Sequence, residues 1–100
     1  MNDIPPIVDN EAMHRFEVTV VGHRAELVYE RDAEHLVLVH TGVPDELEGR
    51  GIGSALVVAA IDDAVRRDLT VVPSCDFARG WLERHPEVAG RVRIEWPAAS

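Results

Sequence analysis

Two features of this 100-residue chain have the chemistry of a reactive site: a run of alternating glycines and a single cysteine. The glycines stand at positions 49, 51 and 53, and a helical pattern begins directly after them. Glycine lets a backbone come close to a ligand, and the free amides at the start of a helix bind anions. We therefore expect a phosphate-bearing cofactor to bind here, against Glu48, Gly49, Arg50, Gly51, Ile52, Gly53 and Ser54.

Three phosphate ligands can be weighed against this glycine turn. A Walker A loop needs a lysine and then Ser or Thr after its last glycine, and Gly53 is followed by Ser54 without a lysine. A dinucleotide fingerprint needs a parallel strand–helix–strand unit, whereas the strands expected before this turn form a meander. The pyrophosphate of coenzyme A needs only the helix start. The residues leave one further alternative open, in which the glycines merely shape a tight turn into the helix.

Cys75 and His40 are the candidate catalytic residues. Cys75 follows a short apolar strand at the start of a second helical stretch, and a helix N-terminus stabilises a thiolate. Cys75 can therefore carry an acyl group or give a proton to a leaving thiolate, unless it is simply a small buried apolar residue. His40 ends an interior strand just before the glycine turn. It can orient a substrate or act as a base, or it can hydrogen-bond the loop.

Composition limits the partners of this chain. Its formal net charge of −8 argues against nucleic acid and anionic membrane surfaces, and it is compatible with an amine substrate. The five histidines show no metal-ligand spacing and Cys75 has no partner thiol, so we expect no metal. A lone cysteine excludes an internal disulfide and fits the reducing cytoplasm. No apolar run approaches the length of a transmembrane helix.

Alternating apolar and polar residues predict three strands with short links. They cover residues 14–21, 23–31 and 35–41, and the third is apolar on both faces. Strands joined in this way form an antiparallel meander. A loop over residues 41–50 then leads to a helix over residues 51–67.

The remaining elements follow that helix. Residues 69–72 are a short strand that returns through one helix, so we expect it to lie parallel to the third strand. Ser74 or Asp76 is expected to cap a second helix, which Pro86 ends. Residues 91–96 alternate like a short edge strand.

The predicted fold class is α+β, with helices packed on a mostly antiparallel sheet. Residues 1–11 are expected to be a flexible tail, residues 12–96 a single domain and residues 97–100 a second tail. A chain of this length holds one hydrophobic core and leaves no room for a second substrate-binding domain.

Four segments in a fixed order resemble a known family. They are similar to segments of a minimal single-domain branch of the Gcn5-related N-acetyltransferase superfamily. The four segments are His40-Thr41-Gly42-Val43-Pro44, the glycine turn with Ser54-Ala55-Leu56, Pro73-Ser74-Cys75 and His85-Pro86. The resemblance covers about residues 16–88. It implies an acetyl-CoA-binding fold and an N-acetyltransferase with a coenzyme A thioester as co-substrate and an unidentified amine acceptor. The alternative is a coenzyme A-binding or protein-interaction module of the same fold with little catalysis.

The resemblance also raises a question about the cofactor. The superfamily has Gln or Arg at the first position of its glycine motif, where this chain has Glu48. Either Glu48 turns outward and Arg50 supplies the charge, or affinity for the pyrophosphate is reduced. The resemblance further implies that backbone amides of the strand over residues 69–73 polarise the thioester carbonyl. The tyrosine that often acts as general acid in larger relatives has no counterpart near Phe77.

Overall fold

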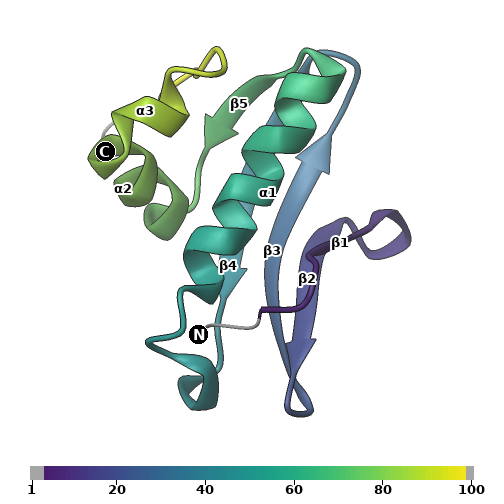
Figure 1. Cartoon of the computed structure of the whole chain (residues 1–100). Coiled ribbons are helices and arrows are strands. Elements are labelled where there is room, and N and C mark those ends of the chain that lie inside the picture. Colours follow the sequence, from purple (N-terminus) through teal and green to yellow (C-terminus); the bar gives the residue numbers. More distant parts are fainter. Residues whose placement is uncertain (1–3, 99–100) are drawn as a thin grey trace.

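The protein is one sheet with helices packed on one side, and the computed structural model describes it for residues 4–98 (Figure 1). Across the sheet lie β1 (Val8–Asn10), β2 (Arg15–Val20), β3 (His23–Arg31), β4 (His35–Gly42) and β5 (Thr70–Pro73). The helices are α1 (Ile52–Arg67), α2 (Asp76–Arg84) and α3 (Pro86–Ala89), with two 3-10 turns, η1 (Glu11–Met13) and η2 (Asp45–Leu47). The predicted α+β class is confirmed, with the meander of β2 to β4 and the parallel pairing of β5 with β4.

One face of the sheet is buried under α1, which lies across β2 to β5 (Figure 1). In β3 the side chains of Ala25, Leu27 and Tyr29 are buried, while those between them face outward. Leu56, Ala60 and Ile61 of α1 pack on this buried face. We call the other side the open face; it carries Glu17, Glu26, Val37 and Val72, which are all partly exposed.

The N-terminal segment belongs to the sheet. The expectation of a flexible tail over residues 1–11 is wrong for Val8–Asn10, which pair with β2 so that Asp9 lies opposite Phe16. Pairing of so short a strand is supported by side chains, because Oδ1 of Asp9 accepts a hydrogen bond from the Tyr29 hydroxyl at 2.5 Å. Sequence periodicity cannot show this attachment, since the partner is twenty residues away along the chain. Residues 1–3 lie outside the described residues.

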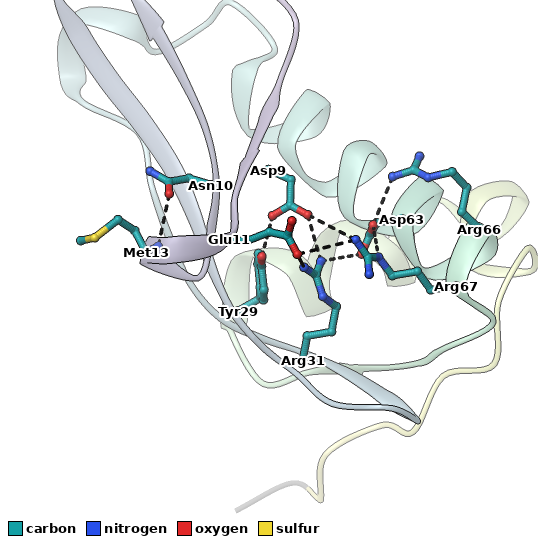
Figure 2. Close-up of polar contacts among 9 residues, drawn as sticks. All are labelled: Asp9, Asn10, Glu11, Met13, Tyr29, Arg31, Asp63, Arg66 and Arg67. Carbon is teal, nitrogen blue, oxygen red and sulfur yellow. Dashed lines mark hydrogen bonds and ion pairs between the residues drawn. The ribbon is translucent and has the colours of Figure 1, made fainter.

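A buried carboxylate ties the N-terminal segment to α1 (Figure 2). Asp63 is fully buried, and its two oxygens accept hydrogen bonds from Arg31 at 2.9 Å, from Arg66 at 3.1 Å and from Arg67 at 2.8 Å. The same Arg31 donates to Asp9 at 3.0 Å and to Glu11 at 2.9 Å. We call Asp9, Glu11, Tyr29, Arg31, Asp63, Arg66 and Arg67 the Asp63 network, because all of them join β1, β3 and α1 around that carboxylate.

Two expectations near the C-terminus need correction. Cys75, rather than Ser74 or Asp76, is the N-cap of α2, because its Sγ accepts from the amide of Ala78 at 3.4 Å. The second helix ends directly before Pro86 as expected, with Arg84 as its last residue and His85 as its C-cap. Pro86 then starts α3, where the missing N–H of proline costs nothing. The edge strand expected over residues 91–96 is reduced to an isolated parallel bridge between Ile94 and Val71.

Candidate active site

The glycine turn presents a row of free backbone amides. Gly49 and Gly51 have φ of +80° and +78°, a conformation that favours glycine, and Gly51 is the N-cap of α1 without a side-chain cap. The first amide to find a partner is that of Ala55, which donates to the carbonyl of Gly51 at 3.0 Å. Within residues 4–98 no group accepts from the amides of residues 49–54. Such a helix start can bind an anion.

A hollow of about 350 Å³ lies in front of this turn, and we call it the turn hollow. Most of the residues expected to contact a cofactor line it, and Arg50 does not. Glu48 borders the hollow with an exposed side chain, so the question of how its charge acts on a bound pyrophosphate stays a prediction. The full lining is Thr41, Val43, Leu47, Glu48, Gly49, Gly51, Ile52, Gly53, Ser54 and Phe77.

Helix α2 closes one side of the turn hollow. The ring of Phe77 packs so closely on Gly53 that an added Cβ at position 53 would lie 2.7 Å from its Cζ. The indole N–H of Trp81 donates to the hydroxyl of Ser54 at 2.8 Å. These two contacts fix α2 against the first turn of α1. Sequence reasoning missed Phe77 as a wall residue, and its place two residues after Cys75 was the only available signal.

The thiol of Cys75 lies where β4 and β5 separate. The pairing of the two strands ends at Leu38 and Pro73, and the amide of Cys75 then donates to the carbonyl of Leu38 at 2.9 Å. The side chain of Cys75 is buried, and its Sγ is 3.1 Å from the hydroxyl of Thr41. Thr41 therefore connects the thiol to the turn hollow, which it also lines.

A bulge in β4 decides which side chains meet. Leu38 lies opposite Tyr29 and His40 opposite Val28, so Val39 is an extra residue that reverses the alternation of the strand. Beyond it Thr41 lies opposite the buried Leu27 and faces the helices. His40 turns instead to the open face, where Gly42 and Glu26 are its neighbours. The structure thus brings Thr41 to Cys75 and leaves His40 on the opposite face of the sheet.

The amides expected to polarise a thioester carbonyl are occupied. Those of Leu69, Thr70 and Val71 each donate at 2.9 Å, to the carbonyls of Ala64, Glu34 and Arg93. Pro73 has no amide hydrogen. These amides are therefore not a free row of donors, because β5 pairs with β4 on one side and Val71 forms a bridge to Ile94 on the other. That expectation is corrected for these residues.

Comparison with known proteins identifies the class. The family model for GCN5-related N-acetyl-transferase matches residues 15–91, and the chain belongs to this family. Protein NATD1 of the mouse is 36% identical over 86 residues, which are 82% of this chain and 78% of the mouse protein. Human protein NATD1 is 39% identical over 64 residues, covering 63% of this chain and 57% of the human protein. The resemblance seen in the sequence is confirmed.

A solved structure supports the same assignment. A GCN5-like protein from Staphylococcus aureus, determined by NMR, superposes with a TM-score of 0.65 and 25% identity over 99% of this chain and 91% of its own length.

Among residues 4–98, none of the helices has the length and apolar character that a membrane span requires. The same residues bring together no group of three or more metal-ligating side chains.

Proposed function

We propose that this chain binds acetyl-CoA at the glycine turn and transfers the acetyl group to an amine. The observation that carries the proposal is the row of unpartnered amides over residues 49–54, which faces a hollow that Thr41 connects to the only thiol of the chain. Membership of an N-acetyltransferase family supports the same ligand.

The amides have the right character for a pyrophosphate, and the wall of the hollow leads onward from them. A cofactor with its pyrophosphate at Gly51 to Ser54 can extend past Phe77 and Gly53 toward Thr41. Its thioester then lies near the end of the β4–β5 pairing, beside Cys75. Glu48 opposes this binding, since it carries a negative charge at the border of the hollow that receives the phosphates.

Two routes lead from this arrangement to product. In the first, the amine attacks the thioester carbonyl, a C–N bond forms and the C–S bond breaks. Cys75 gives its proton to the departing sulfur and regains one from the amine nitrogen. In the second, the thiolate of Cys75 attacks first, coenzyme A leaves as its thiol, and the amine then attacks acetyl-Cys75. Either role uses the place of Cys75 at the start of α2, where its thiol contacts the hydroxyl of Thr41.

The absence of lysine gives a clean test of the second route. All ten basic residues of the chain are arginines, so no side-chain amine can accept acetyl from the cofactor. Incubation with acetyl-CoA alone, followed by mass spectrometry, should show acetyl on Cys75 that hydroxylamine removes if the route passes through the thiol. Acetyl confined to the α-amino group of Met1, with transfer intact, would establish direct attack.

Calorimetric titration with acetyl-CoA tests the proposal as a whole. Saturable binding together with acetylation of any amine supports it, and binding without transfer to any amine would favour the coenzyme A-binding module instead. No binding of acetyl-CoA or of free coenzyme A would overturn it. Desulfo-coenzyme A serves as a matched ligand, because it keeps the pyrophosphate and lacks the sulfur.

A further inference from the structure

A second hollow lies on the open face, directly behind the site just described. It measures about 290 Å³ and is lined by Arg24, Glu26, Gly42, Val43 and Pro44; we call it the open-face hollow. Val43 lines both this hollow and the turn hollow. The two hollows are therefore separated by little more than the end of β4.

Charged groups in the open-face hollow have free bonding capacity. Arg15 and Arg24 approach Glu26 at 3.6 and 3.9 Å, distances too long for hydrogen bonds, and both approach Oε1. Within the described residues Oε2 has no hydrogen-bond or ion-pair partner, and it lies 4.0 Å from the position that a Cβ of Gly42 would take. The carboxylate thus offers an unused oxygen to the hollow, and Arg24 offers a guanidinium that is half-exposed.

His40 lies beside Gly42, at the border of the open-face hollow. Its Nε2 would lie 3.4 Å from a Cβ at position 42, and within residues 4–98 its ring makes no hydrogen bond. The bulge at Val39 is the reason, because it turns His40 to the open face while Thr41 turns to Cys75. A base and a carboxylate therefore meet at Gly42, one residue along the chain from the group that contacts the thiol.

The helix-covered face and the open face of the sheet are connected around the unpaired edge at the end of β4. Pairing with β5 ends at Leu38, and in the described part of the chain no strand pairs with Val39 to Thr41 on that side. A molecule on the open face can reach around this edge toward a thioester beside Cys75. The acceptor and the cofactor would then approach from opposite faces of one strand end.

Resting on the proposed function, we infer that the acceptor is a small zwitterionic amine, of the amino-acid class, bound in the open-face hollow. Oε2 of Glu26 binds the ammonium group of this acceptor, and the guanidinium of Arg24 binds its carboxylate as a bidentate hydrogen-bond donor. His40 removes one proton from the ammonium group, and the free amine then attacks the acetyl carbon. As the C–N bond forms, the C–S bond breaks with its electron pair on the coenzyme A sulfur, and the second proton that the nitrogen loses passes to that sulfur.

Matched pairs of substrates test this assignment. Each L-amino acid of a panel is compared with its carboxamide, which keeps the amine and lacks the carboxylate. We expect the acids to be acetylated with a kcat/KM about tenfold higher than the amides. The fraction of unprotonated amine alone would give the opposite preference, because the amine of the carboxamide is less basic and more of it is unprotonated.

Four variants separate the roles. Arg24→Gln should remove the preference for acids and leave the amides unaffected, whereas Glu26→Gln should raise KM for acids and amides alike by about tenfold. His40→Gln should lower kcat by at least about a hundredfold with little change in the KM of the amine. Gly42→Ala fits without strain, since its contacts begin at 3.4 Å, and should raise the KM of the amine alone.

Cofactor binding is measured on the same proteins by calorimetry. All four variants should bind acetyl-CoA like the parent chain and unfold at the same temperature. Acids and amides acetylated equally well, or transfer unaffected by both Arg24→Gln and Glu26→Gln, would overturn the inference. Acetyl-CoA binding with no transfer to any member of the panel would also overturn it while leaving the cofactor site standing. Loss of acetyl-CoA binding in the parent chain would refute both proposals.

Discussion

His40 and Thr41 are neighbours in sequence, yet their side chains serve opposite faces of the sheet. Thr41 contacts the Sγ of Cys75 at 3.1 Å, and His40 stands over Gly42 beside Glu26. The extra residue Val39 produces this division. A single bulge thus places a polar group on each side of the strand end where the cofactor and the acceptor are proposed to meet.

The Thr41–Cys75 contact predicts graded losses of transfer. Cys75→Ser keeps a good helix cap and therefore the fold, and it should lower kcat by more than about a hundredfold while acetyl-CoA still binds. Thr41→Val removes only the hydroxyl partner of the thiol and should cost about tenfold. Thr41→Ser is the matched control and should retain most of the activity. Full activity in Cys75→Ser would assign the thiol a capping role alone.

Glu48 should limit the affinity for the cofactor. Glu48 borders the turn hollow, so Glu48→Gln is expected to tighten acetyl-CoA by about fivefold, or about 1 kcal/mol, in calorimetry at low salt. Glu87→Gln changes the net charge equally but lies on α3, and it should have little effect. Equal tightening in both variants would mean that the overall charge of −8, rather than Glu48, opposes binding.

Sequence patterns predicted those parts of the fold in which local rules decide. Alternation located β2, β3 and β4, and the glycine turn located the start of α1. Three features lay beyond such rules. The strand Val8–Asn10 depends on Asp9 reaching Tyr29, the cap of α2 is a thiol rather than a preferred oxygen, and the bulge at Val39 has no residue signature. The strand and the bulge depend on pairing partners distant in the chain, whereas the cap is local but uses Cys75, a residue that cap preferences do not favour. The bulge determines which candidate site residues come together.

The buried Asp63 should be the most sensitive carboxylate for stability. Asp63→Asn removes the fully buried charge that pairs with the largely covered guanidinium of Arg31, and it should lower the free energy of unfolding by about 3 kcal/mol. Asp62→Asn, the adjacent residue on α1, breaks only a half-exposed pair with Arg91 and should cost under about 0.5 kcal/mol. Urea unfolding followed by circular dichroism compares the two. Similar losses of unfolding free energy in the two variants would show that the Asp63 network stabilises the fold no more than a surface ion pair does.

The turn between β2 and β3 carries removable strain. Val21 has φ of +50° and is exposed, and Gly22 follows with φ of +78°. Two positive φ angles in a two-residue hairpin turn favour Asn-Gly, and a β-branched residue is unfavourable there. Val21→Asn should therefore raise stability by about 1 kcal/mol and the melting temperature by about 4–8 °C. Val21→Thr remains β-branched and should give no such gain; an equal gain would attribute the effect to lost apolar exposure.

Tyr29 should make the protein sensitive to alkaline pH. Burial, reinforced by its hydrogen bond to Asp9, holds the pKa of the phenol well above its usual range. The phenol of an unfolded chain loses its proton at about pH 10, while the folded chain keeps it above that pH. The contribution of the protonated phenol to the free energy of unfolding is therefore complete below about pH 10 and is lost as the pH rises further. Stability should then fall by about 1.4 kcal/mol for each unit of pH.

Urea titrations between about pH 9 and about pH 11.5 measure this slope directly. Tyr29 is the only tyrosine and the chain has no lysine, so few other groups titrate in this range. Tyr29→Phe should be less stable at neutral pH, because Asp9 loses a donor, but it should lack the tyrosine part of the alkaline slope. Any slope from groups other than Tyr29 is common to both proteins and cancels in the difference. Parallel slopes in the two proteins would show that the phenol ionises as readily in the folded chain as in the unfolded one.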